Sequence, residues 1–194
     1  MEGDETTSCF QAELLSPVLS DGEKPWAFVV LPKSVSATLP RRGRTTVDGQ
    51  LAGHGFRATL EPDGQLSHWL RVSRVLLEAA GVAAGDVVTV RILPVAEEPE
   101  PELPADLREA LAAAPEAWAV WQQTTTIARL DWVHWVTTAK QAKTRAKRIN
   151  DACQMLAAGK RRVCCFDPSG FYSKAFSAPK RADQVAALAR KRTS

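Results

Sequence analysis

Short segments of alternating apolar and polar residues run through the first half of the chain. Phe10, Ala12 and Leu14 alternate with polar neighbours, which is the pattern of a strand with one buried face. The pattern predicts five or six strands and one short helix, which Ser73 caps and Gly81 ends. The strand segments are residues 10–14, 26–31, 45–51, 56–60, 65–72 and 87–93. Such a set suits a small closed β-barrel, because closure removes exposed sheet edges.

The second half of the chain has helical periodicity instead. Apolar residues recur three and four positions apart, and the last predicted helix carries the stripe Ile149, Ala152, Cys153 and Leu156. We expect helices at residues 106–114, 116–123 and 127–139 and, after a break near Gln141, up to residue 159.

These two patterns predict an α+β chain in which a β-barrel at residues 9–95 precedes a helical domain at residues 105–166. The acidic, proline-rich run at residues 96–104 is expected to be a stiff linker, because proline can neither continue a helix nor pair within a sheet. An ordered strap crossing the barrel is the alternative. Residues 167–194 have few aliphatic side chains and a basic end, so we expect a flexible tail.

The formal charge of +3 conceals an asymmetry between the two halves. Residues 1–104 hold 9 basic and 15 acidic residues, a net charge of −6, whereas residues 105–194 hold 16 and 7, a net charge of +9. The total of 25 lysines and arginines against 22 acids is too even to indicate a dedicated nucleic-acid-binding protein. With 45% hydrophobic residues, the chain is neither disordered nor fibrous.

Several classes of protein and site find no support in the sequence. The chain contains no apolar stretch of the roughly 18 to 20 residues that a membrane-spanning helix needs, and its first residues are acidic, so we expect a cytoplasmic protein. The four cysteines, which include the adjacent pair Cys164 and Cys165, have no metal-ligand spacing, so no metal or cofactor is predicted. No catalytic motif is present, and we therefore expect no enzymatic activity.

Two stretches resemble known families. The first looks like a bacterial family of unknown function with a small β-barrel fold, and its motifs are residues 28–32, 39–44, 47–49, 55–56, 60–64 and 85–86. The second resembles the bacteriocin-protection family, also called YdeI or OmpD-associated, at residues 132–136, 139–140, 144–145, 148–149, 155–157, 159–162 and 164–167. The two domains often occur in one chain. The second resemblance implies a part in tolerance of antimicrobial peptides or envelope stress, without an established reaction.

The helical half offers one group of candidate binding residues. On a helix, Lys140 and Thr144 lie opposite the apolar stripe and face water, whereas Arg145 lies within about 40° of Ile149 and Arg148 lies near the stripe's edge. An arginine on an apolar face needs a carboxylate or carbonyl partner, so either these two form internal pairs, for instance with Asp131 or an acid of the barrel, or they bind an anionic ligand. Trp132 and Trp135 are either core residues or an aromatic wall beside that ligand.

A second candidate is the basic loop of Arg41, Arg42 and Arg44 around Gly43, which is either solvated or binds an anion. Together these features predict a non-enzymatic binding protein linked to stress or antimicrobial-peptide tolerance, with a small anionic or amphipathic ligand or a partner protein. The alternative is a nucleic-acid-associated protein that uses its basic C-terminal helices. Self-association through the oppositely charged halves, for instance as a homodimer, is a third hypothesis.

Overall fold

The computed structural model describes residues 7–164 and 166–192, without the side chains of residues 188–192. The chain divides into two compact units, one formed by residues up to Ala96 together with those from Ser169 onward, the other by Glu97–Pro168. No helix in the described part of the chain has both the length and the apolar character needed to span a membrane.

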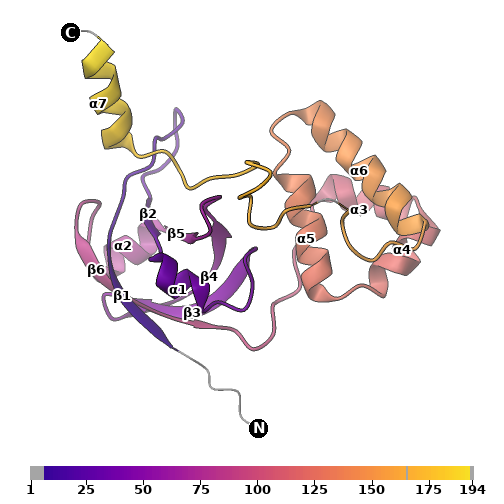
Figure 1. The fold of residues 1–194 in the computed structure, drawn as a ribbon, viewed down its shortest axis with the longest axis horizontal. Coiled ribbons are helices and arrows are strands. Elements are labelled where there is room, and N and C mark those ends of the chain that lie inside the picture. The colour runs from indigo at the N-terminus through magenta and orange to yellow at the C-terminus, as the bar shows by residue number, and fades with distance from the viewer. Residues whose placement is uncertain (1–6, 165, 193–194) are drawn as a thin grey trace. The chain divides into compact units, whose positions relative to one another are not determined.

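The first unit contains a nearly closed barrel of six antiparallel strands (Figure 1), which confirms the predicted fold class. The strands follow the order β1-β6-β3-β4-β5-β2 around the sheet. Closure is made just beyond β1, where Leu15 and Phe28 exchange two backbone hydrogen bonds of 2.8 and 2.9 Å. The strands are β1 (Ser8–Glu13), β2 (Ala27–Val30), β3 (Thr45–Leu51), β4 (His54–Pro62), β5 (His68–Val72) and β6 (Val87–Pro94).

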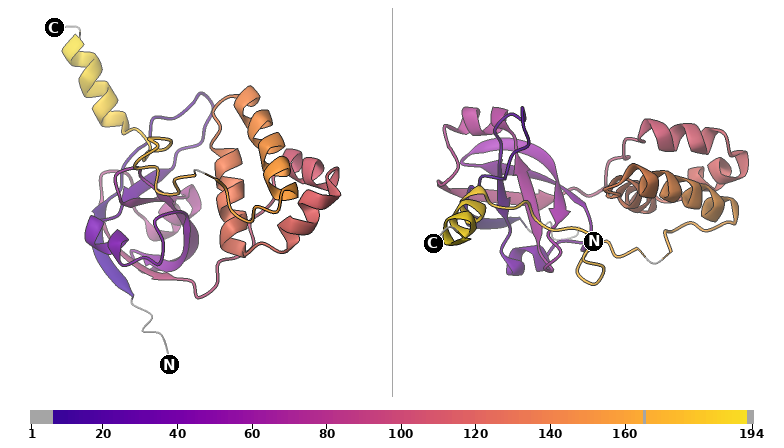
Figure 2. Two further views of the ribbon diagram at one scale, coloured as in Figure 1. Left: turned by 45° about the vertical axis from the view of Figure 1, so that its right-hand side comes forward. Right: turned by 90° about the horizontal axis from the view of Figure 1, so that it is seen from above.

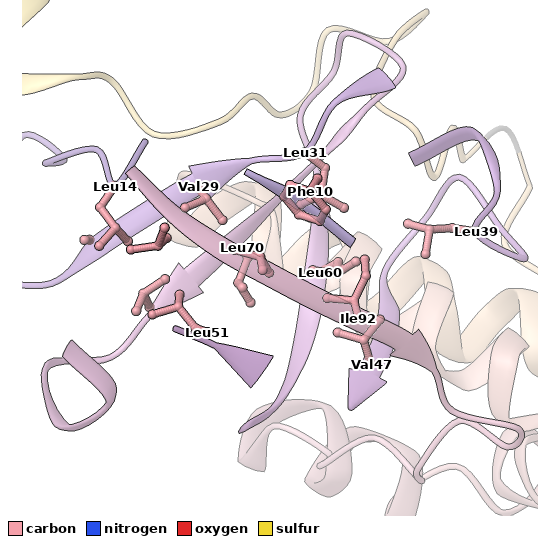
Figure 3. Packing of buried hydrophobic residues seen from close by; sticks show 14 residues of the cluster. Phe10, Leu14, Val29, Leu31, Leu39, Val47, Leu51, Leu60, Leu70 and Ile92 are labelled. Atoms are coloured by element: carbon pink, nitrogen blue, oxygen red, sulfur yellow. The ribbon is translucent and has the colours of Figure 1, made fainter. Parts of the chain in front are cut away.

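The barrel interior is filled by the alternate residues that the sequence pattern assigned to the buried face. Val47, Leu60 and Val90 are fully buried, and Figure 3 shows Phe10 and Leu70 among the side chains gathered between the strands. Because successive residues of a strand point to opposite faces, this pattern also fixes which residues point outward.

Two short helices lie beside the barrel. The predicted one, α2 (Arg74–Ala80), begins after Ser73, whose hydroxyl accepts the N–H of Leu76 (3.2 Å), and ends at Gly81 in the left-handed conformation. The structure adds α1 (Lys33–Ala37), which follows Pro32. A helix of five residues makes little more than one turn, so it produces no apolar repeat that the sequence pattern could reveal.

The C-terminal segment of the first unit is attached to the barrel. Val18 donates its N–H to the carbonyl of Lys180 (2.9 Å), and Ala182 donates to the carbonyl of Ser16 (3.0 Å). The helix α7 (Ala182–Arg192) follows. The sequence pattern beyond residue 166 indicated neither this helix nor this attachment, and flexibility of the segment remains a prediction.

The second unit consists of helices whose order and approximate bounds match the predicted ones (Figure 2). Its core gathers Leu107, Trp121, Trp132 and Leu156 from all of them. Residues of the Glu-Pro run belong to this unit, because Glu100 forms an ion pair with Arg129. The helices are α3 (Ala105–Ala112), α4 (Pro115–Gln122), α5 (Thr126–Thr137) and α6 (Ala142–Ala157).

Candidate functional site

A gap between two strands of the barrel produces a cavity. β4 has nine residues, but it pairs with the five-residue β5 only through Glu61 with Trp69 and Pro62 with His68. The preceding residues of β4 therefore separate from β5, and α2, which follows β5 directly, lies beside the opening. The resulting cavity has a volume of about 900 Å³, at the upper end of the range for drug-sized ligands.

The floor of this cavity is apolar. Phe56 and Ala58 share the inward face of β4 with the buried Leu60, and both are half-buried. Leu76 and Ala79 of α2 complete the floor. The phenyl ring of Phe56 is held over β3, where its cross-strand partner Gly49 has no side chain; a Cβ there would lie 2.6 Å from the ring.

The rim of the cavity carries charge from the outward-facing residues. Arg57 binds Asp48 through Nε and Nη2, both at 2.6 Å, and these bonds lower the pKa of Asp48 and raise that of Arg57. Arg44 donates Nε–H to Glu61 at 2.9 Å. Three arginines, including Arg71, therefore face one glutamate among the lining residues, with the exposed His54 at the edge.

Arg71 is held in a different way from the other two arginines. Its ion pair with Glu23 is long, at 3.6 Å, and its guanidinium carbon lies 3.8 Å from the centre of the Trp26 ring. Glu23 is already bound by the backbone N–H of Ser20 and by Trp26 Nε1, and these hydrogen bonds, the Ser20 bond above all, lower the pKa of Glu23. Stacking on an aromatic ring fixes the guanidinium while its edge remains available to a ligand.

The predicted basic loop is brought to this cavity through Arg44 alone. Arg42 is exposed and donates to the carbonyl of Leu66 (3.3 Å), and Arg41 is half-buried. The loop is anchored at Gly43, whose carbonyl oxygen accepts the Nε2–H of the buried His68 at 2.9 Å. Burial is the main reason that the pKa of His68 lies below its ordinary value.

The two predicted arginines of the helical unit are engaged in internal contacts. Arg145 donates from Nε and Nη2 to both carboxylate oxygens of Asp106, at 2.6 and 2.9 Å. The sequence suggested Asp131 or an acid of the barrel; the acid is Asp106, at the start of α3. Arg148 donates from Nη1 to the carbonyl of Trp135 near the end of α5, where carbonyl groups lack helical partners.

The remaining predicted residues of the helical unit surround this pair of contacts. Trp132 is fully buried and packs edge-to-face against the half-buried Trp135, with ring centres 6.0 Å apart. Lys140 is exposed in the connection before α6, and Thr144 is half-buried in the first turn of that helix. The structure thus brings Trp132, Trp135, Arg145 and Arg148 into one unit, where their contacts stabilise the packing of α3, α5 and α6.

Sequence reasoning missed most of the cavity. Phe56, Trp69 and Leu76 lie within the predicted strand and helix segments, but neither they nor Arg57 and Arg71 were among the predicted site residues. The sequence carried no usable signal for the cavity, because the predicted strand segments 56–60 and 65–72 did not show that β4 would have nine residues and β5 only five. That mismatch leaves part of the edge of β4 unpaired.

Comparisons with known proteins confirm both resemblances. Residues 10–92 match the family described as a domain of unknown function, DUF1905, and this range contains the whole of the cavity lining. Residues 100–159 match the family described as bacteriocin-protection, YdeI or OmpD-associated. No curated protein matches the chain. The chain therefore combines a region that matches the DUF1905 family with a following region that matches the bacteriocin-protection, YdeI or OmpD-associated family.

Proposed function

We propose that this protein is a non-enzymatic binding protein that acts in tolerance of antimicrobial peptides or related stress, and that it holds a small amphipathic anion in the cavity between β4, β5 and α2. The observation that carries the proposal is the combination of an apolar floor with a rim of three arginines. The description of the second family supports the link to bacteriocin protection.

The chemistry of the lining favours binding over catalysis. Arginine stays protonated at any physiological pH and so cannot act as a general base, and the carboxylate of Glu61 is bound by Arg44. The hydroxyl of Ser73, which also lines the cavity, is used to cap α2. These groups can orient and neutralise an anion. His54 is exposed at the edge of the cavity with its Nδ1 3.2 Å from the carbonyl oxygen of Ala52, so it is not held beside a nucleophile of the lining.

Native mass spectrometry of the freshly purified full-length protein tests the proposal. We expect an additional mass, of the size of a small ligand, that is lost in Ala79→Trp, because Ala79 is exposed on α2 and a tryptophan there would occupy the cavity without disturbing the core. The matched control is Ala112→Trp on α3, an exposed helical alanine of the other unit. A ligand that both variants retain equally would refute the cavity as the binding site.

The physiological part of the proposal needs a separate measurement. In a strain that lacks the gene, we expect the wild-type protein and Ala112→Trp to restore growth in the presence of antimicrobial peptides, and Ala79→Trp to fail at equal protein level. Full restoration by Ala79→Trp would separate peptide tolerance from the cavity.

A further inference from the structure

We infer that the ligand of this cavity is a monomeric single-chain amphiphile with a carboxylate head, which Arg71 binds, and an alkyl chain that lies along Phe56, Ala58, Leu76 and Ala79. This inference rests on the proposed function and specifies the chemistry of the same site.

The head group is assigned to Arg71 by comparing the three arginines of the rim. Arg57 makes two hydrogen bonds of 2.6 Å to Asp48, and Arg44 makes one of 2.9 Å to Glu61, so each already has a close carboxylate. Among the described residues, the carboxylate nearest to Arg71 is that of Glu23 at 3.6 Å, and the side chain of Arg71, which stacks on Trp26, is 55% exposed. A ligand carboxylate can therefore accept two parallel N–H bonds from Arg71 without displacing a tight ion pair.

The alkyl chain is assigned to the floor because of how the strands separate. Beyond the pair of Glu61 with Trp69, the described part of β4 has no pairing with β5, and its inward residues Ala58 and Phe56 line the cavity while packing against the barrel core. Leu76 and Ala79 face them from α2. Burying these apolar surfaces against an alkyl chain is favourable, since it removes both from water.

The shape of the cavity favours a single free amphiphile molecule as the ligand over the lipid headgroups of a membrane surface. Binding to anionic lipid headgroups uses basic side chains spread over an exposed surface. Here the apolar groups lie in an open recess of about 900 Å³ with the arginines at its rim, an arrangement with room for the chain of one molecule.

Isothermal titration calorimetry of the full-length protein with hexanoate, octanoate, decanoate, octanol and octylamine tests the inference. We expect octanoate to bind, each added methylene to lower Kd about fourfold, octanol to bind at least about tenfold more weakly, and octylamine not to bind. Arg71→Gln should weaken octanoate about tenfold or more and leave octanol unchanged. Arg91→Gln, which removes an exposed arginine of β6 outside this cavity, should behave like the wild type.

The outcomes separate the two proposals. Equal affinity for octanol and octanoate, or wild-type octanoate binding by Arg71→Gln, would overturn the head-group assignment while leaving a cavity-binding protein. A Kd that does not depend on chain length would overturn the alkyl-chain assignment, and so would binding to anionic vesicles without binding to monomeric octanoate. If no probe binds and the purified protein carries no additional mass, the proposed function fails as well.

Discussion

The imidazole of His68 donates its Nε2–H to the carbonyl oxygen of Gly43 over 2.9 Å, from a side chain that is 1% exposed. Because a carbonyl oxygen can only accept, Nε2 must carry a proton. Burial lowers the pKa of His68 and so favours the neutral ring, in which Nδ1 accepts a hydrogen bond of 2.7 Å from the hydroxyl of Ser36 in α1. One neutral histidine therefore connects β5, α1 and the loop that leads to Arg44 at the rim of the cavity.

This arrangement predicts a loss of stability in mild acid. The unfolded chain takes up a proton at His68 near pH 6.5, whereas burial lowers the pKa of this residue in the folded protein. The unfolded state therefore binds more protons as the pH falls below about 6.5, and the free energy of unfolding should decrease there by up to about 1.4 kcal/mol per pH unit. Above that range the contribution of His68 is constant.

Urea unfolding between pH 5 and pH 7.5 measures this effect. In His68→Gln the glutamine can still donate an amide N–H to Gly43, but it has no titratable group. The free energy of unfolding of this variant should therefore fall less steeply below about pH 6.5 than that of the wild type, and the difference in slope is the contribution of His68. The charged groups Asp63, Arg42 and Glu61 also act on His68, which is why the comparison uses the difference between two proteins with the same surroundings. Identical pH profiles would mean that His68 takes up its proton over the same pH range in the folded and the unfolded protein.

The hairpin between β3 and β4 predicts a stabilising substitution. Ala52 and Gly53 form its turn with φ values of 47° and 85°, so an alanine occupies the left-handed region. Asparagine tolerates this conformation better, and we expect Ala52→Asn to raise the free energy of unfolding by about 0.5 to 1 kcal/mol. Ala52→Val, with a β-branched side chain, should lower it. Thermal unfolding of both variants checks the prediction, and an Asn variant no more stable than the Val variant would contradict it.

Most of the fold could be predicted from the sequence because its signals are local. The alternation around Phe10 or Val47 and the cap and stop at Ser73 and Gly81 act within a few residues, and the strands and α2 form where they indicate. The family resemblances added the order of the two domains. The cavity was not predicted, because it arises from how far β5 continues alongside β4, and pairing between strands is a property of the folded sheet.

The partners of the helical arginines show the same limit. The angular position of Arg145 relative to Ile149 indicated correctly that this cation needs an acid. Helical geometry within one segment could not identify Asp106, which is 39 positions away along the chain.

The pair of Arg145 and Asp106 is predicted to be structural. Their side chains are 29% and 45% exposed, so solvent screens the interaction, and a bidentate pair of this kind contributes about 0.5 to 1 kcal/mol. A double-mutant cycle with Arg145→Gln and Asp106→Asn, followed by urea unfolding, should give a coupling free energy of about that size that decreases in high salt. Binding of octanoate should be unchanged in both variants. A coupling of zero, together with loss of ligand binding in Arg145→Gln alone, would restore Arg145 as a ligand-binding residue.

A close contact at Gly64 holds the C-terminal segment against the barrel. Gly64 has a φ of +70°, and a Cβ at this position would lie 2.3 Å from the carbonyl oxygen of Phe176. Gly81 has a similar φ of +64°, but a Cβ there would meet nothing within 4 Å. Gly81→Ala should lower the free energy of unfolding by about 1 kcal/mol, through backbone strain alone. Gly64→Ala should lower it by more, because the segment around Phe176 must also move.

Hydrogen exchange measures whether this contact holds the segment. It should accelerate at the amides of Val18 and Ala182 in Gly64→Ala and not in Gly81→Ala, because these amides bond the segment to the barrel. Equal losses of stability without a difference in exchange would show that this contact does not hold the segment in place.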